Sequence, residues 1–246
     1  AHLPMILGPD KKRLSKRHGA TGVQEYREQG YLANALINYL ALLGWNPGTE
    51  QEVFSLDELI KQFSIERVQK KSAVFDEKKL QWMSGQHIYK KSASEILNSI
   101  RFNNPGWRKS ENVNYVLKVI ELMKERVKSL RDMIEMTAIF FEDPNNYDKK
   151  TVKKRWKDNT INDLITKFEK SLDKIELWDA EQIEIALRSL AEHENISAGK
   201  IIHPTRVGLS GIGSGPSLFD MMVLLGKETC LRRIQKALKT LPVIDD

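Results

Sequence analysis

The residues most able to do chemistry stand near the amino end, in the run Gly8-Pro9-Asp10-Lys11-Lys12-Arg13-Leu14-Ser15-Lys16-Arg17-His18-Gly19. Five cationic side chains fall within seven positions, and glycines stand on both sides of the run. Ammonium and guanidinium groups clustered around one hydroxyl suit a chain of phosphates. On charge alone, a solvated basic tail fits this run better than a phosphate loop. Both interpretations therefore stay open at this point.

A second concentration of positive charge lies in the middle of the chain. Residues 101–157 carry 14 basic and 8 acidic side chains, whereas residues 158–246 carry 11 and 14. The densest part surrounds Trp156 and consists of Lys149, Lys150, Lys153, Lys154, Arg155 and Lys157. RNA binding requires cations along phosphates and flat groups for unstacked bases. A solvated face with Trp156 turned inward is an equal alternative. Four other tryptophans are expected to be packing anchors rather than base platforms, namely Trp45, Trp82, Trp107 and Trp178.

Helices must position these groups, because apolar residues recur at helical spacing along most of the chain. Residues 31–43 give the clearest such pattern. Capping residues predict further helix starts at Ser55, Asp76, Ser92 and Ser129, and the helix that follows Asp76 is predicted to end near Gly85. Convincing alternating strands are absent, so the predicted fold class is mainly α.

The polar segment 143–159 contains a proline, paired asparagines and six basic residues. Such a composition is typical of a connection between elements, and it predicts a boundary between two helical bodies here.

The composition excludes several classes of protein. The chain has 246 residues, of which 41% are hydrophobic and 29% are charged, and its formal net charge is +6. These values fit a globular protein rather than a collagen, a disordered tail or a membrane span. The single cysteine, Cys230, can form neither an internal disulfide nor a cysteine zinc site, which favours the cytoplasm. The histidines are scattered singly, so no metal site is predicted. The first residue, Ala1, indicates a piece of a longer protein.

Several stretches resemble bacterial-type glutamyl-tRNA synthetases, which are glutamate-tRNA ligases. Leu14-Ser15-Lys16 resembles the Lys-Met-Ser-Lys-Ser signature of class I aminoacyl-tRNA synthetases, and the surrounding residues 2–10, 17–20 and 40–45 look like the same family. Residues 54–59, 73–76 and 79–83 are similar to its stem-contact region. Residues 199–207, followed by Gly211 and Gly215-Pro216, resemble its last helical domain. The resemblance covers essentially the whole chain.

The resemblance implies a domain order. Residues 1–30 would be the end of a class I catalytic domain, and residues 31–95 a stem-contact domain. Two helical anticodon-binding subdomains, an α-helix cage, would follow in residues 96–157 and 158–246.

The resemblance also implies an activity. The family activates glutamate with Mg-bound ATP and transfers it to the 3′ end of tRNA. Lys16 corresponds to the second lysine of the signature and would contact ATP phosphates, with Ser15 beside it as a further catalytic residue. Arg13 stands where the family has the first lysine, and a guanidinium can still hold a phosphate. The ATP and glutamate pocket is missing from this sequence, so the chain alone is expected to be inactive and to hold no cofactor.

The expected partner is tRNA, contacted at its acceptor stem and anticodon. The resemblance favours Arg206 as an anticodon contact, together with Thr205 and Lys200, and the basic run adds Lys153, Lys154 and Arg155. The family implies a monomer, and no membrane is expected. The alternative is a freestanding helical RNA-binding module without catalysis. Such a module has no reason to keep a phosphate-closing loop, which favours the ligase.

Overall fold

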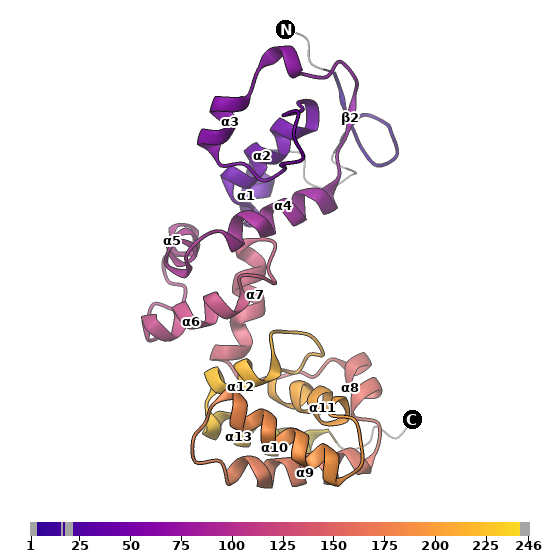
Figure 1. Ribbon diagram of the computed structural model, residues 1–246, viewed down its shortest axis with the longest axis vertical. Coiled ribbons are helices and arrows are strands. Elements are labelled where there is room, and N and C mark those ends of the chain that lie inside the picture. The colour runs from indigo at the N-terminus through magenta and orange to yellow at the C-terminus, as the bar shows by residue number, and fades with distance from the viewer. Residues whose placement is uncertain (1–3, 16, 18–21, 242–246) are drawn as a thin grey trace. The chain divides into compact units, whose positions relative to one another are not determined.

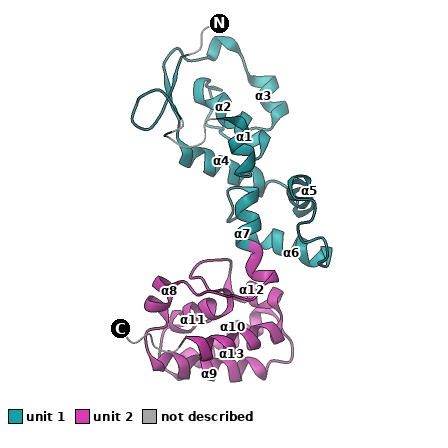
Figure 2. Cartoon of the chain, turned by 180° about the vertical axis from the view of Figure 1, so that it is seen from behind, with its two compact units in different colours: residues 1–136 teal, residues 137–246 magenta. Residues whose placement is uncertain are grey.

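The computed structural model describes residues 4–15, 17 and 22–241 and divides into two compact units, residues 1–136 and 137–246 (Figure 2). Helices build both units, and the only strands in the described ranges are two residues long. The mainly α fold is therefore confirmed. None of the described helices is both long enough and apolar enough to cross a membrane.

The first unit begins with a strand and contains seven helices of the described chain and a 3₁₀ turn, the last helix crossing into the second unit (Figure 1). In chain order these elements are β1 (Ile6–Leu7), α1 (Val23–Glu28), α2 (Ala33–Gly44), α3 (Leu56–Gln62), η2 (Ile65–Arg67), β2 (Ala73–Val74), α4 (Glu77–Tyr89), α5 (Ala93–Asn103), α6 (Val113–Met123) and α7 (Leu130–Phe141). The two strands pair in parallel, with Ile6 opposite Ala73.

The predicted helix starts of the first unit are confirmed by their caps. Ser55 and Ser92 each form a capping box, in which the serine accepts from the third helical residue and a glutamate reaches back to the serine backbone. Ser129 Oγ accepts from the Asp132 backbone at 3.0 Å, so α7 starts where the sequence predicts. These starts depend on short-range hydrogen bonds alone, which makes them readable in the sequence.

Helix α4 starts after Asp76 as predicted, but it does not end near Gly85. The helix continues to Tyr89. A Cβ atom on Gly85 would lie 3.2 Å from the carbonyl oxygen of Val127, a contact tighter than side chains normally make. The glycine therefore serves a close approach of the chain from residues 125–128 rather than a helix end.

The core of the first unit packs α2 against α4. Leu36 and Tyr39 of α2 and Leu80 and Met83 of α4 are buried in one cluster with Tyr26. The Tyr39 hydroxyl accepts from the Asp76 backbone at 2.7 Å, which ties the start of α4 to α2. Burial raises the pKa of Tyr39 to about 12, so this hydroxyl stays protonated at neutral pH.

The second unit is a helical body whose members are α8 (Lys149–Arg155), α9 (Asn159–Asp173), α10 (Ala180–His193), α11 (Gly199–Ser210), α12 (Leu218–Leu225) and α13 (Lys227–Thr240), preceded by the end of α7. Helix α9 packs against α10, α11 and α13, and α11 packs against α13. Phe168, Val207 and Ile234 are among the side chains that this packing buries. Cys230 is fully buried in α13, and burial raises its pKa to about 12.

The two compact units of the structure do not divide at the predicted boundary segment 143–159. The two units divide at residues 136 and 137, inside α7, and α8 forms within the segment and packs on α11. Val152 and Trp156, four residues apart, are buried, and Trp156 Nε1 donates to Asn162 Oδ1 at 2.6 Å. The polar composition reflects the exposed side of a short helix, whose two apolar residues suffice to dock it.

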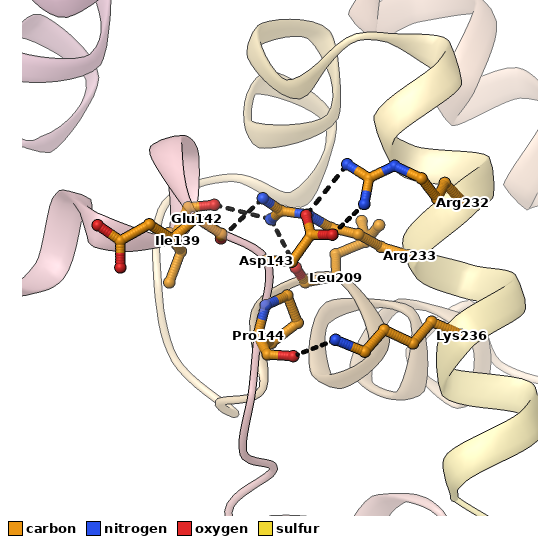
Figure 3. A network of polar contacts seen from close by, with 8 residues as sticks. All are labelled: Ile139, Glu142, Asp143, Pro144, Leu209, Arg232, Arg233 and Lys236. Atoms are coloured by element: carbon orange, nitrogen blue, oxygen red, sulfur yellow. Dashed lines mark hydrogen bonds and ion pairs between the residues drawn. The ribbon is translucent and has the colours of Figure 1, made fainter.

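A buried arginine ties the end of α7 to the rest of the second unit (Figure 3). Arg233 of α13 is 2% exposed. Its guanidinium donates to the Asp143 carboxylate at 2.9 Å and to the carbonyl oxygens of Ile139, Glu142 and Leu209 at 2.7, 2.8 and 2.9 Å. The neighbouring Arg232 also pairs with Asp143 and, with Arg233, holds the pKa of that carboxyl below its usual range.

Candidate nucleic-acid interface

A groove of about 500 Å³ lies in the second unit, where the carboxyl end of α8 meets the amino ends of α9 and α11. Four cationic side chains line this cationic groove, namely Lys154, Arg155, Lys157 and Lys200. Among the described residues, Asp158 is the single acidic residue that lines it. The lining is therefore strongly positive, which suits a polyanion.

The docking of α8 explains why its cations face outward. Val152 and Trp156 turn toward α11, where a Cβ on Gly208 would lie 3.6 Å from the Trp156 ring. An inward-facing Trp156 was one of the two alternatives left open by the sequence, and its exposed fraction of 3% shows that this alternative is correct. With the apolar positions inward, Lys153 and Lys154 are exposed and Arg155 is half-buried.

Of the two helix amino ends at the groove, only that of α11 has no side-chain cap and adds to the positive character of the groove. The Asp158 carboxylate accepts from the Thr160 backbone at 3.0 Å and caps α9. Helix α11 starts after Ala198, which provides no side-chain cap. Backbone N–H groups at a helix start favour negative charge. Pro204 inside α11 has no N–H, so it cannot donate to the Lys200 carbonyl one turn earlier.

His203 also lines the cationic groove and is neutral at pH 7. Burial lowers its pKa below the ordinary value, and the nearby charges of Arg155, Arg206 and Lys154 lower it further. The imidazole thus supplies a hydrogen-bonding group rather than a charge at neutral pH. Sequence reasoning passed over His203 because it stands alone in the sequence.

The structure brings together some of the predicted RNA contacts and separates others. Lys154, Arg155 and Lys200 lie in one groove although some 45 residues separate them in the sequence. Lys153 is exposed on α8 but does not line the groove. Lys157 belongs to the same basic run and also lines the groove, but it was not among the predicted RNA contacts.

Thr205 and Arg206 are buried within α11. Thr205 is fully buried, and Arg206 is 9% exposed. A Cβ on Gly215 would come within 3.0 Å of Arg206 Nη1, so the guanidinium lies against the loop between α11 and α12. Arg206 is therefore not an exposed, solvated arginine.

The predicted phosphate loop is described only in part. Lys16 and His18 lie outside the described residues. Residues 6–14 form a tight turn in which Leu14 N donates to the Ile6 carbonyl at 3.0 Å and Gly8 N donates to the Lys12 carbonyl at 2.7 Å. Arg13 is exposed, Ser15 is half-buried, and Arg17 pairs with Asp10 at 2.9 Å. The pairing of β1 with β2 anchors this turn.

Comparison with protein families decides the relationship. The family model described as an anticodon binding domain matches residues 78–238. This chain belongs to that family. The catalytic-domain family of class I tRNA synthetases for E and Q matches residues 1–82. The anticodon-binding match includes the whole cationic groove, and the catalytic-domain match includes the basic run near the amino end.

Individual relatives agree with the family models. The glutamate–tRNA ligase of Moorella thermoacetica is 42% identical over 243 residues, and that of Chloroherpeton thalassium is 41% identical over 253 residues; the alignments cover 96% and 98% of this chain. Each alignment covers 50% of the relative, so the chain spans about half the length of the curated relatives that it matches. The predicted resemblance to glutamate-tRNA ligases is confirmed.

A solved structure supports the same relationship in three dimensions. The glutamate tRNA ligase of Elizabethkingia meningosepticum, crystallised with its amino acid, matches with a TM-score of 0.82 and 34% identity. The match covers 98% of this chain and 51% of that one.

Proposed function

We propose that this chain is the tRNA-binding part of a glutamate–tRNA ligase. The cationic groove is the observation that carries the proposal, because it gathers Lys154, Arg155, Lys157 and Lys200 within an anticodon-binding domain. Cations arranged in this way neutralise RNA phosphates and release their counterions. The anticodon arm of tRNA would occupy the groove, with Lys153 on the adjacent face of α8.

A tRNA titration at several salt concentrations tests this proposal. Lys200→Gln should weaken binding several-fold at low salt and lower the salt slope by about one phosphate contact. Lys170→Gln is the matched control, since Lys170 is exposed on α9 and lies about 15 Å along that helix from its start at the groove. Equal effects of the two substitutions would contradict a specific role for the groove.

The proposed roles of Arg206 and Thr205 need a separate test because both residues are buried. As an anticodon contact, Arg206 would act through the loop of residues 211–217 that its guanidinium touches at Gly215. Arg206→Lys keeps the charge but loses the planar fork. It should change the preference among tRNAs with swapped anticodons more than it changes overall affinity, which competition binding would measure.

The basic run near the amino end is proposed to serve ATP in the whole enzyme. Lys16, with Ser15 and Arg13, would hold the phosphates of Mg-bound ATP while the glutamate carboxylate attacks the α-phosphorus and pyrophosphate leaves. The exposed guanidinium of Arg13 supports such a contact. A cation that meets the pyrophosphate more tightly in the transition state lowers the barrier. Acyl transfer to the terminal ribose hydroxyl of tRNA would follow.

Lys16→Ala in the whole enzyme should therefore lower the rate of adenylate formation far more than tRNA affinity. Pyrophosphate exchange and tRNA binding measure the two quantities separately. Equal losses in both would contradict the assignment of Lys16.

The 246-residue chain alone should bind tRNA as a monomer and should not aminoacylate it. The catalytic-domain match is confined to residues 1–82, and about half of each relative has no counterpart here. The catalytic-domain match also supports the ligase over the alternative, a freestanding RNA-binding module. A role in translation would place the protein in the cytoplasm.

A further inference from the structure

A second groove, of about 340 Å³, lies in the first unit between α4 and the segment that joins α6 to α7. Trp82, Gln86 and Tyr89 line it from α4, and Arg126 and Lys128 line it from the joining segment. We call it the aromatic groove. Its lining combines flat rings, amides and cations, whereas the described residues that line the cationic groove of the second unit include no aromatic ring apart from the imidazole of His203.

The helical spacing of α4 explains why the rings face outward. Trp82, Gly85, Gln86 and Tyr89 stand at positions i, i+3, i+4 and i+7, which form one face of a helix. Leu80, Met83 and Ile88 point elsewhere and are buried. Trp82 is 44% exposed and Tyr89 is 48% exposed. The prediction that Trp82 is a packing anchor is therefore wrong.

Trp82 is the ring of this groove that is available to a ligand. Within the described part of the chain, its ring contacts no other ring and its indole N–H donates to no acceptor. Tyr89, by contrast, has the Lys124 ammonium 5.6 Å from its ring centroid, and Lys124 is paired with Glu121 at 2.7 Å. The tyrosine is thus held in place, while the tryptophan offers a large flat surface to solvent.

The joining segment brings cations to the opposite side of the groove. Arg126 and Lys128 are exposed, and Glu125 is the single acidic residue among the described residues that line the groove, so cations outnumber anions there. The Lys128 backbone donates to Asp132 Oδ2 at 2.9 Å, and its ammonium lies 3.5 Å from Gln81 Oε1. Gly85 permits the close approach of this segment to α4.

We propose that the aromatic groove binds an unpaired nucleotide of RNA. The base would stack on Trp82, Gln86 would hydrogen-bond its edge, and Lys128 and Arg126 would hold the adjoining phosphate. Stacking on an aromatic ring beside a cation is how proteins hold single-stranded nucleic acid, because every base has a flat face. A base inside a duplex is already stacked and cannot enter. This inference rests on the proposed function and adds a contact in the other unit.

Binding of the whole 246-residue chain to three labelled probes tests the proposal: a bacterial tRNA pool, a single-stranded RNA of twelve nucleotides and a duplex of the same length. Trp82→Ala should weaken binding of the single strand about 5- to 100-fold, in keeping with the contribution of one stacked base. Trp82→Phe should restore most of the affinity. Phe102→Ala is the control, because Phe102 is 77% exposed on α5 and does not line the groove.

Salt dependence separates the ring from the cation. Trp82→Ala should lower affinity by the same factor at every salt concentration, since stacking releases no counterions. Lys128→Gln should lower the salt slope by about one contact, whereas Lys61→Gln, an exposed lysine of α3, should leave it unchanged. Thermal melting by circular dichroism checks that each variant stays folded.

Three results would overturn the proposal. One is unchanged single-strand binding by Trp82→Ala, the result expected if a protein segment occupies the groove. Another is an equal loss for duplex and single strand, and the third is failure of Trp82→Phe to recover affinity. If Lys200→Gln weakens tRNA binding while Trp82→Ala does not, the aromatic groove alone is rejected. If the unchanged chain binds the single strand through Trp82 but binds no tRNA, the proposed function alone is rejected.

Discussion

Trp82 and Trp156 both stand near lysines in the sequence, yet the first is 44% exposed and the second 3% exposed. Trp156 follows the short helix α8, fits over Gly208 and donates its N–H to Asn162. Trp82 lies on the side of α4 opposite the core residues of that helix. A tryptophan among cations is therefore no base platform by itself. The helix face on which it falls decides its role.

The two grooves differ in the type of interaction that they offer to RNA. The cationic groove would bind phosphates, so its contribution to RNA affinity should fall as salt rises. The aromatic groove offers stacking, which salt weakens little. Each groove lies within one unit, so each can be changed without touching the other.

The largest expected effect comes from removing the buried guanidinium of the second unit. Arg233→Met leaves the carbonyl oxygens of Ile139 and Leu209 without this donor and should lower the free energy of unfolding of that unit by about 3 kcal/mol. Hydrogen exchange resolved by segment should show loss of protection in residues 137–241 only. Arg232→Met is the control and should cost less than about 1 kcal/mol, because that side chain is largely exposed. Equal loss of protection in both units would contradict two separately stabilised bodies.

The next effect concerns independence of the grooves. Trp82→Ala and Lys154→Gln should each weaken tRNA binding, and the double variant should show the product of the two losses, about 30-fold or more at low salt. Distant sites without shared partners contribute additively, and these residues belong to different units. Equilibrium titration of the four proteins measures the coupling. A double variant no weaker than the worse single variant would mean that one groove binds RNA only after the other has bound.

The smallest effect is a pH dependence confined to the cationic groove. The pKa of His203 is lowered, so the imidazole becomes charged only as the pH falls below its ordinary value of 6.5. Charging adds a cation beside the phosphates, and tRNA affinity should rise about two- to fivefold between pH 7 and pH 5. The contribution of His203 to folding runs the other way, since the unfolded chain takes up the proton first; it is complete above pH 6.5 and is lost as the pH falls.

His203→Gln should abolish the pH effect on tRNA binding. His87 in the first unit is half-buried, its Nε2 lies 2.9 Å from Asn38 Oδ1, and it lines neither groove, so its titration should not change tRNA binding. Affinity that rises equally in the His203→Gln variant would assign the effect to another group.

The features that could be predicted from the sequence are those that depend on neighbours along the chain. The caps at Ser55, Ser92 and Ser129 each use residues within three positions, and all three were predicted at the right place. The end of α4 was not predicted correctly, because Gly85 allows the close approach of Val127, which is far away in the sequence. The helix within segment 143–159 was also not predicted, since Val152 and Trp156, which are buried where α8 packs against α11, outweigh the polar composition of the segment.

The candidate sites show the same limit. The basic run identified Lys154 and Arg155 by their density, but only the folded chain places Lys200 and His203 beside them. The family resemblance pointed to Arg206, and the structure adds that its guanidinium is covered by the Gly215 loop. The aromatic groove was not predicted, because the face of α4 that lines it can be recognised only when the helix is known to extend to Tyr89.

The lone thiol of the chain has a practical consequence. Cys230 is buried and its pKa is raised to about 12, so its thiol is almost entirely protonated at neutral pH. Thiol-reactive dyes attack the thiolate form, and they should therefore not label Cys230. A cysteine introduced at an exposed site in either unit would then be the group that takes the dye, with the native residue left in place. Fluorophores attached in this way, one unit at a time, would report separately when each half of the molecule meets RNA.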